Sequence, residues 1–243
     1  FNKGDNFGCG YFQVTEKNGF RCSTAVGYLN PVKKRKNLKI ITKAHVKNIE
    51  FNGNEAYAVN YWHKGKIIKV KANAEIILSL GSIGSPHILQ VSGIGPSKLL
   101  NENNVKIIKE NNYVGENLHD HLMLRPVYTV QNVETLNELY HSTYKKILAG
   151  LQFIFQSKGP LTMGASMLCG FTKSDSSLAT PDLQFHVAPM STDKLGGSTL
   201  HDFPAFTPTI SNIRPTSRGS IELKSSDTRV SPKIKMNYLS TNE

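Results

Sequence analysis

A glycine-rich turn after an apolar run is the part of the sequence with the clearest potential for chemistry. Residues 75–80 read Glu-Ile-Ile-Leu-Ser-Leu, and Gly81 and Gly84 follow them closely. A buried strand, a glycine turn and a helix would direct free backbone N–H groups and the positive end of a helix dipole at a ligand. Gly81 and Gly84 would let the backbone approach that ligand closely. The stretch therefore predicts a βα corner that can face an anion such as a pyrophosphate.

The residues after this turn predict a short helix. Ser85 is a favoured N-cap residue, Pro86 suits the first helical position, and Gly93 suits the position just after the last turn. A glycine turn ahead of a helix serves structure more often than ligand binding. On these residues alone, both interpretations stay open.

Histidines are the other candidates for chemistry. His119 and His121 flank Asp120, an arrangement that could belong to a metal site or to a catalytic triad. No third ligand stands at a diagnostic spacing, so the sequence predicts no metal site. His186 lies within an alternating segment, where it is either a core histidine or a residue that faces a pocket.

The elements expected around the glycine turn are mainly strands. Three segments between residues 46 and 71 alternate polar and apolar side chains, and turns at Asn52-Gly53 and Lys64-Gly65 separate them. These features predict a three-stranded antiparallel meander. The run at 75–80 is apolar almost throughout, which is typical of a strand covered on both faces in a parallel sheet.

Helical and antiparallel patterns follow further along the chain. Apolar residues three and four positions apart, between about 137 and 157, predict an amphipathic helix that packs into the core and ends at Gly159-Pro160. Residues 183–187 and 220–224 alternate as strands of a sheet with one wet face. The pattern changes near residue 122, where we expect a domain boundary.

Length and composition fit a folded protein with one large domain or two smaller ones. The chain has 243 residues, of which 39% are hydrophobic and 19% charged. No apolar run reaches the roughly 18 residues that a membrane span needs, so we predict no transmembrane segment. Cys9, Cys22 and Cys169 are odd in number and scattered, which favours a reduced, intracellular setting.

The formal net charge of +11 would favour nucleic acid or an acidic membrane surface if it were clustered. The densest basic run, at residues 33–36, lies between Pro31 and Asn37, where a solvated turn is expected. We therefore predict no nucleic-acid partner. A basic binding module stays open as an alternative function.

Several separated segments resemble the glucose–methanol–choline (GMC) flavoprotein oxidoreductases, in the same order. Residues 75–96 resemble the second signature of that family, and residues 114–121, Val-Gly-Glu-Asn-Leu-His-Asp-His, resemble its VGENLQDH loop. Residues 10–29 resemble the segment before the meander, residues 159–162 a substrate-domain segment, and residues 214–238 the start of the C-terminal region. The resemblance covers essentially the whole chain, and the bacterial choline-dehydrogenase-like branch looks nearest.

The resemblance implies an α/β plus α+β fold. Residues 1–121 would form part of an FAD-binding Rossmann-type domain that carries the antiparallel meander. Residues 122–243 would form a substrate-binding region with an antiparallel sheet and helices, and the family's C-terminal region would open near residue 213. The implied reaction is FAD-dependent oxidation of an alcohol, a CH–OH donor, to an aldehyde or ketone. Hydride would pass to the flavin, and a histidine would take up the hydroxyl proton.

Two parts that this chemistry requires do not occur in the sequence. The family's flavin domain begins with a G-x-G-x-x-G unit, and its catalytic histidine lies near the C-terminus. We therefore expect an internal fragment that has no catalytic residue of its own and is inactive alone. A non-oxidising flavoprotein or a lyase of the same fold stays open as an alternative.

The resemblance assigns cofactor-binding roles to four residues. Val46 would meet the adenine through its backbone, and on sequence alone it is equally well a strand-core valine. Leu80 and Gly81 would approach the flavin nucleotide, where Leu80 departs from the small residue that is usual and its larger side chain would crowd the ligand. Ser85 would be a helix cap first and a neighbour of the cofactor second.

Met167 and His186 are the candidate substrate-pocket residues. Met167 stands where many alcohol- and choline-oxidising relatives carry a glutamate, whose carboxylate could balance a quaternary ammonium. Without that charge a neutral alcohol fits better. An aromatic cage could still hold a cation. We expect a small-molecule alcohol as substrate and either a quinone or oxygen as electron acceptor. We also expect a cytoplasmic location, with peripheral association with the inner membrane left open.

Overall fold

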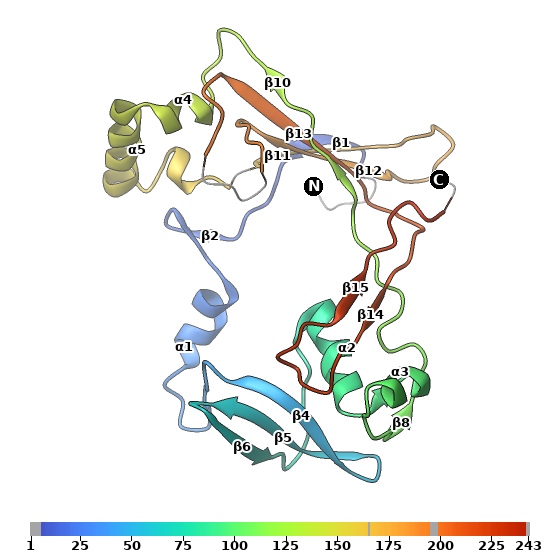
Figure 1. Cartoon of the computed structure of the whole chain (residues 1–243). Coiled ribbons are helices and arrows are strands. Elements are labelled where there is room, and N and C mark those ends of the chain that lie inside the picture. Colours follow the sequence, from blue (N-terminus) through green and yellow to red (C-terminus); the bar gives the residue numbers. More distant parts are fainter. Residues whose placement is uncertain (1–5, 165, 195–198, 242–243) are drawn as a thin grey trace. The chain divides into compact units, whose positions relative to one another are not determined.

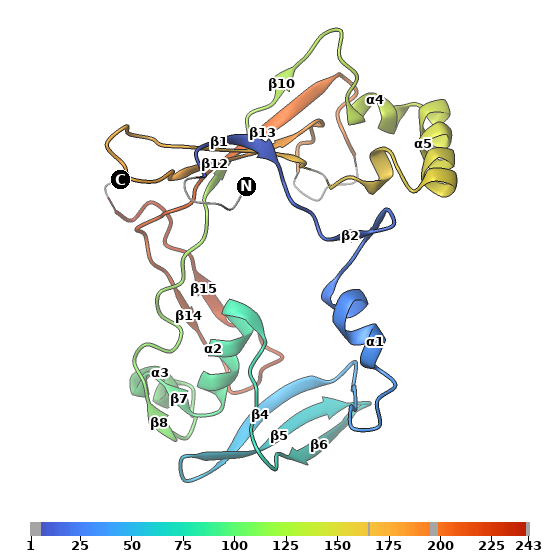
Figure 2. The same ribbon diagram turned by 180° about the vertical axis from the view of Figure 1, so that it is seen from behind.

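The computed structural model describes residues 6–164, 166–194 and 199–241, which fold into two compact units (Figures 1 and 2). Unit 1 contains Phe1–Lys39 and His121–Arg214, and unit 2 contains Ile40–Asp120 and Pro215–Glu243. Both units are therefore discontinuous in sequence. One of their boundaries, between Asp120 and His121, lies close to the boundary expected near residue 122, and the chain also enters unit 2 before the meander and returns to it for the C-terminal region.

An antiparallel six-stranded sheet forms the centre of unit 1. Five strands lie in the order β1, β11, β12, β13, β10, and β9 pairs with β13 beyond the end of β10. Their bounds are β1 (Gly8–Tyr11), β9 (Met123–Leu124), β10 (Tyr128–Thr129), β11 (Leu168–Thr172), β12 (Leu183–Ala188) and β13 (Ala205–Asn212). The strand expected at 183–187 and the antiparallel sheet expected in the second region are confirmed.

Shorter elements connect this sheet to the rest of unit 1. They are the ribbon of β2 (Glu16–Lys17) and β3 (Phe20–Arg21), a π-helical turn at Ala25–Leu29, α1 (Asn30–Val32) and a 3-10 turn at Pro160–Thr162. The basic run at 33–36 follows α1 directly and is largely in turn conformation, as expected for a solvated loop.

Two helices replace the single helix expected over 137–157. They are α4 (Leu136–His141) and α5 (Thr143–Gln156), and they meet at Ser142. Ser142 has an extended backbone, and its hydroxyl accepts a hydrogen bond from the backbone N–H of Lys145 at 3.3 Å. Ser142 therefore ends α4 and caps α5, because a hydroxyl at this position satisfies an N–H group that the helix cannot.

The apolar stripe of this helical segment does not pack into a core. Ala149 is buried in α5, whereas Tyr144, Ile147, Leu151 and Ile154 are 69%, 56%, 46% and 71% exposed. The prediction of core packing is therefore wrong in this structure. Periodicity shows that a helix has an apolar side, but it does not show which part of the protein covers that side.

Unit 2 contains the expected meander. β4 (His45–Asn52), β5 (Glu55–His63) and β6 (Lys66–Lys71) pair in this order, and all pairs are antiparallel. Gly53 and Gly65 lie in the two turns with φ values of +58° and +77°, which confirms both hairpin positions. The β4–β5 register shifts between Val46 and Asn48.

Helices and short strands pack beside the meander. They are α2 (Gly81–Val91), α3 (Ser97–Glu102), the parallel pair β7 (Ile94–Gly95) and β8 (Lys109–Glu110), and the antiparallel pair β14 (Ser220–Glu222) and β15 (Lys233–Lys235). The hydroxyl of Ser92, just after α2, accepts a hydrogen bond from the N–H of Ile49 in β4 at 2.9 Å. Leu100, Val105 and Leu223 form a buried core cluster between these elements.

The apolar run at 75–80 is not a strand in this structure. Ile77 is 76% exposed, and none of the strands in the described part of the chain pairs with this run. The prediction of a buried parallel strand is therefore wrong here, because such a strand needs hydrogen-bonded neighbours and cover on both faces.

A polar cluster on the meander lowers the pKa of Glu50. The carboxylate accepts hydrogen bonds from Lys69 and Tyr57, each at 2.5 Å, and from the side-chain amide of Asn60 at 2.6 Å. These bonds, with that of Lys69 first, lower the pKa of Glu50 from 4.5 to about 2. The ionised carboxylate therefore ties β4 to both of the following strands.

We expect this cluster to make stability depend on pH. Because folding lowers the pKa of Glu50, its stabilising contribution is complete above about pH 4.5 and is lost as the pH falls towards 2. Urea unfolding of the isolated chain across this range should show the free energy of unfolding falling more steeply than in Glu50→Gln. Glu55→Gln, on the same hairpin but outside the cluster, should follow the wild type. Parallel pH profiles for wild type and Glu50→Gln would contradict this account.

Candidate functional site

The glycine turn that was expected to face a ligand lies at the start of α2. Gly81 has a φ of +76°, and a Cβ on it would meet no atom within 4 Å, so open space adjoins its backbone. Leu80 is 43% exposed, and a Cβ on Gly84 would lie only 2.8 Å from the Cβ of Leu80. Gly84 therefore makes room for Leu80 over the first turn of the helix.

Ser85 is not the N-cap of this helix, so that prediction is wrong. α2 begins at Gly81, which places Ser85 and Pro86 in its second turn. The hydroxyl of Ser85 instead accepts a hydrogen bond from the backbone N–H of Leu80 at 3.3 Å. Pro86 has no N–H group, so the carbonyl of Ser82, four residues earlier, lacks its usual helical donor.

A pocket of about 330 Å³ lies beside these turns of α2. Its lining comes from the helix, the following loop and β14: Ser82, Pro86, Gly115, Glu116, Asn117, Leu118, His119 and Ile221. The volume is at the lower end for small-molecule sites. The first turn of a helix leaves backbone N–H groups without intrahelical partners, and the lining adds a hydroxyl, a carboxylate, an amide and an imidazole. The pocket can therefore both donate hydrogen bonds to a polar ligand and accept them from it.

Gln90, which the sequence analysis did not single out, holds the walls of this pocket together. Its Nε2 donates hydrogen bonds to the carbonyl oxygens of Val114 and Ile221 at 3.0 and 2.9 Å. Its Oε1 accepts one from the N–H of Leu223 at 2.9 Å. The side chain is 1% exposed, and its bonds to Ile221 and Leu223 are buried. The sequence held one signal for this role, because Gln90 is a long polar residue within an expected helix, on the side that the structure buries.

Val46 lies in β4 and does not line the α2 pocket. Its carbonyl oxygen accepts a hydrogen bond from the hydroxyl of Thr228 at 2.6 Å. Arg229, which follows Thr228 in the sequence, places its guanidinium 4.5 Å from the centroid of the Trp62 ring. An adenine contact with the carbonyl of Val46 would therefore share that oxygen with Thr228, which its two lone pairs permit.

Met167 and His186 lie on one face of the sheet in unit 1. His186 is paired with Cys169 across β11 and β12, and Met167 precedes Cys169 by two residues, so both side chains project to the same face. Phe12 joins them, because its N–H donates to the carbonyl of Met167 at 2.9 Å and its ring stacks on His186 with centroids 4.8 Å apart. Burial, and then His121, lower the pKa of His186, which favours its neutral form.

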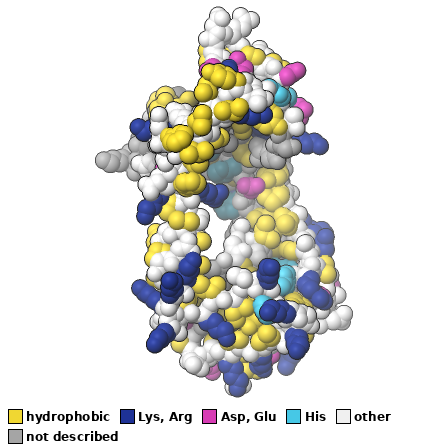
Figure 3. Space-filling view, turned by 90° about the vertical axis from the view of Figure 1, so that its left-hand side faces the viewer, with side chains coloured by type: hydrophobic (Ala, Val, Ile, Leu, Met, Phe, Trp, Pro, Cys, Tyr) yellow, Lys and Arg dark blue, Asp and Glu magenta, His cyan; other side chains and the backbone are white. Residues whose placement is uncertain are grey.

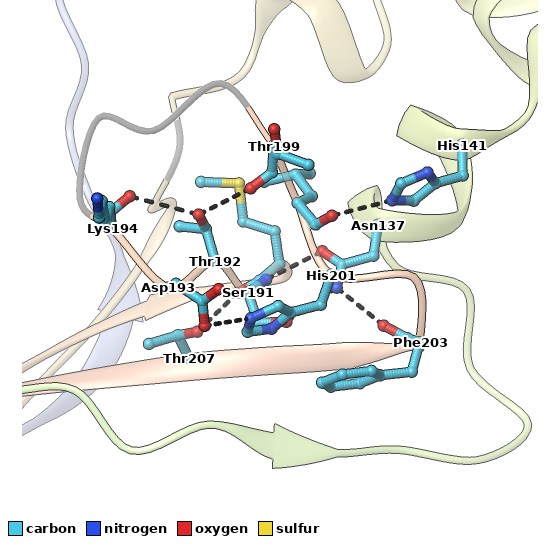
Figure 4. A network of polar contacts seen from close by, with 12 residues as sticks. Asn137, His141, Ser191, Thr192, Asp193, Lys194, Thr199, His201, Phe203 and Thr207 are labelled. Atoms are coloured by element: carbon cyan, nitrogen blue, oxygen red, sulfur yellow. Dashed lines mark hydrogen bonds and ion pairs between the residues drawn. The ribbon is translucent and has the colours of Figure 1, made fainter.

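A serine, a histidine and an aspartate form an arrangement that the sequence analysis did not anticipate (Figure 4). Nδ1 of His201 lies 2.9 Å from Oγ of Ser191, and Nε2 lies 2.9 Å from Oδ1 of Asp193. Ser191 is 0% exposed, and its hydroxyl also accepts a hydrogen bond from Asn137 of α4 at 2.9 Å. A substrate carbonyl cannot reach such a hydroxyl, so the arrangement does not fit nucleophilic catalysis. It fastens the segment after β12 to α4.

His119 and Asp120, which are neighbours in the sequence, have different surroundings in the structure. His119 lines the α2 pocket, and Asp120 accepts a hydrogen bond from the hydroxyl of Tyr238 at 2.8 Å, which raises the pKa of Tyr238. Within the described residues, no group of three or more His, Cys, Asp or Glu side chains is placed to hold a metal ion. None of the described helices is long and apolar enough to cross a membrane.

A family model described as GMC oxidoreductase matches residues 1–123, which is more than half of the chain. The chain belongs to the GMC oxidoreductase family. It is 34% identical over 252 aligned residues to an alcohol dehydrogenase (acceptor) of Pseudomonas putida, covering 100% of this chain and 44% of that protein. It is 36% identical over 230 residues to oxygen-dependent choline dehydrogenase 1 of Chromohalobacter salexigens, covering 94% of this chain and 40% of that protein.

Solved structures agree with this GMC assignment at the level of the fold. A formate oxidase variant of Aspergillus oryzae, described in work on modification of its FAD, superimposes with a TM-score of 0.85 and 22% identity. The superposition covers 97% of this GMC chain and 45% of the formate oxidase chain. The α/β plus α+β fold expected from the resemblance is thus confirmed. The chain spans less than half the length of each of these three proteins.

Proposed function

We propose that this chain is an internal portion of an FAD-dependent GMC enzyme that oxidises an alcohol to an aldehyde or ketone. The observation that carries the proposal is the family match over residues 1–123. Its two relatives described above are named as dehydrogenases of alcohols and of choline. The family match removes the motivation for a basic binding module, and a non-oxidising flavoprotein or lyase of the same fold is the alternative that the test below distinguishes.

The α2 pocket fits part of an FAD molecule. FAD, when bound, supplies the hydride acceptor for alcohol oxidation. Gly81 would bring its backbone close to the cofactor, since open space adjoins it, and Ser82 and Asn117 would hydrogen-bond polar groups. Glu116 in the same lining disfavours a pyrophosphate, because two anions would share the pocket, and favours hydroxyl groups that can donate to a carboxylate. We therefore propose a hydroxyl-bearing part of the cofactor at this pocket, whereas the expectation of a pyrophosphate at the glycine turn stays a prediction.

The roles expected for Val46, Leu80, Gly81 and Ser85 stay predictions, and the geometry supports them unequally. The support is best for Gly81, whose backbone adjoins open space. Ser85 uses its hydroxyl to accept from Leu80, which leaves it a supporting position. The division into a flavin-binding region at 1–121 and a substrate-binding region at 122–243 also stays a prediction.

A neutral alcohol is the substrate that the residues on the unit 1 sheet favour. Met167 brings no carboxylate that could balance a quaternary ammonium, and an imidazole such as that of His186 cannot balance one in either protonation state. We propose that Met167 and His186 line the substrate pocket of the whole enzyme. The electron acceptor remains either a quinone or oxygen, and we propose a cytoplasmic enzyme, with peripheral association with the inner membrane left open.

A chimera tests this function. In it, residues 1–243 replace the matching region of the Pseudomonas putida alcohol dehydrogenase, which contributes the remaining 56% of its own length. We expect the purified chimera to show the flavin absorption band near about 450 nm and to lose it when a primary alcohol is added without oxygen. The isolated chain should purify without colour.

Two results would count against the proposal in different ways. A chimera that binds flavin but keeps its absorption with every alcohol tested would favour a non-oxidising flavoprotein. A folded chimera without flavin would remove the cofactor role. The unmodified Pseudomonas putida enzyme is the matched control for both measurements.

A further inference from the structure

α5 turns its apolar side outward. We call the six side chains on this side the outer stripe; they are Tyr144, Ile147, Leu148, Leu151, Ile154 and Phe155. Each is between 46% and 80% exposed. Figure 3 views the molecule from the side on which α5 lies in Figure 1, and hydrophobic side chains gather there on the surface of unit 1.

The opposite side of α5 fastens the helix, so the outer stripe is not exposed by a free rotation of the helix. Ala149 is buried, and the Phe153 ring packs edge-on against Phe20 with centroids 5.0 Å apart. Lys145 forms an ion pair with Glu134 at 2.7 Å. These contacts set which side faces outward.

Leaving the outer stripe in water is unfavourable. Buried apolar surface contributes about 25 cal/mol per Å², and an aromatic side chain can bury roughly 150–250 Å². Two of the six residues, Tyr144 and Phe155, are aromatic and among the most exposed, at 69% and 80%. Contiguous apolar patches of more than a few hundred Å² are rare on monomeric proteins and mark interaction surfaces. The outer stripe therefore has the character of an interaction surface.

We propose that the outer stripe is an internal packing surface of a longer GMC polypeptide, covered by a segment of that polypeptide outside the region matched here. The same fold covers 97% of this chain but only 45% of the formate oxidase chain, so more than half of that protein lies outside the matched region. A second site points the same way, because Ile77 in the uncovered apolar run of unit 2 is 76% exposed.

Two other occupants fit the contacts less well. A helix that lies on an anionic membrane directs its lysines at the lipid, whereas here Lys145 pairs with Glu134 and Lys146 lies 5.0 Å from the centroid of the Tyr140 ring. A second copy of the chain would need about 800 Å² per partner for a stable interface. The six side chains of the outer stripe lie on one helix of 14 residues, and a dimer is one of the outcomes that the test below distinguishes.

The substitution Ile154→Lys tests the proposal, made both in the isolated chain and in the chimera. In the isolated chain the lysine faces water, so the melting temperature should stay the same and binding of a hydrophobic dye should fall. In the chimera the lysine would be buried without a partner, so the melting temperature should fall by several degrees. Gln156→Lys, on the same helix but away from the outer stripe, should leave both proteins unchanged.

Three outcomes would overturn the proposal. The first is a chimera whose melting temperature is unaffected by Ile154→Lys. The second is a dimer of the chimera, seen by light scattering, that Ile154→Lys converts to a monomer. The third is binding of the wild-type chimera, but not of its variant, to vesicles of phosphatidylcholine and phosphatidylglycerol. If the full chimera does not fold, replacing only the helix that matches residues 143–156 in the Pseudomonas putida enzyme carries the same test. None of these readouts depends on flavin or on activity, so the proposed function can fail separately.

Discussion

Replacing Gln90 by leucine should lower the free energy of unfolding of the isolated chain by about 3 kcal/mol or more. The reason is that three backbone groups, the carbonyls of Val114 and Ile221 and the N–H of Leu223, would lose their partner together, and the bonds of the last two are buried. Each unsatisfied buried group costs about 1–3 kcal/mol. Leucine fills much of the same space but restores none of these bonds.

Urea unfolding followed by tryptophan fluorescence measures this loss, since Trp62 in β5 is the only tryptophan of the chain. Hydrogen exchange should locate the damage at the junction of the loop with β14. There the amides of Leu118 and Ile221, which bond to Gly219 and Gly115, should exchange faster. Gln156→Leu, at an exposed position of α5, is the control and should change stability little. A loss below about 1 kcal/mol for Gln90→Leu would mean that the three groups find other partners.

Replacing Gly115 by alanine should cost about 2–4 kcal/mol at the same junction. Gly115 has a φ of +95°, and a Cβ on it would lie 2.2 Å from the carbonyl oxygen of Ile221 and 2.4 Å from Nε2 of Gln90. The substitution therefore adds a steric clash to an unfavourable backbone conformation. The same unfolding measurement applies.

Gly53→Ala separates the two contributions. Gly53 also has a positive φ, +58°, but a Cβ there would meet no atom within 4 Å, so only the conformational cost of about 1–2 kcal/mol is expected. Equal losses for both variants would show that the backbone around Gly115 relaxes freely. Because Gly115 lies beside Gln90, the double variant that combines Gln90→Leu with Gly115→Ala should lose less stability than the sum of the two single losses.

The elements that the sequence predicted well are those whose signals lie within a few residues. Asn52-Gly53 and Lys64-Gly65 form the turns of the meander, because a positive φ at a hairpin tip is a local requirement that glycine meets. Gly93, with a φ of +92°, ends α2 as expected. The predicted start of α2 at Ser85 and Pro86 was wrong, because glycines at 81 and 84 allow an extra turn ahead of Pro86.

The two predictions that failed for a whole element both assumed that another part of the chain covers an apolar surface. The run at 75–80 and the outer stripe of α5 both have patterns of buried elements, yet Ile77 and Ile154 are 76% and 71% exposed. An apolar pattern indicates that a surface is covered in the folded protein. It does not identify the covering segment.

The amino-acid sequence was sufficient for the GMC family and for the meander, because these depend on local order along the chain. The roles of Gly81, Met167 and His186 stay predictions. Tertiary structure was needed to join distant segments: Gln90 meets Ile221 from 131 residues away, and Phe12 meets both Met167 and His186. It also showed that Ser191, His201 and Asp193 form a structural contact in which the serine hydroxyl is buried, although their residue types are those of a catalytic triad. The contacts of Gln90 and Phe12 depend on how the chain closes loops of more than a hundred residues, and no local pattern of residue types encodes that closure.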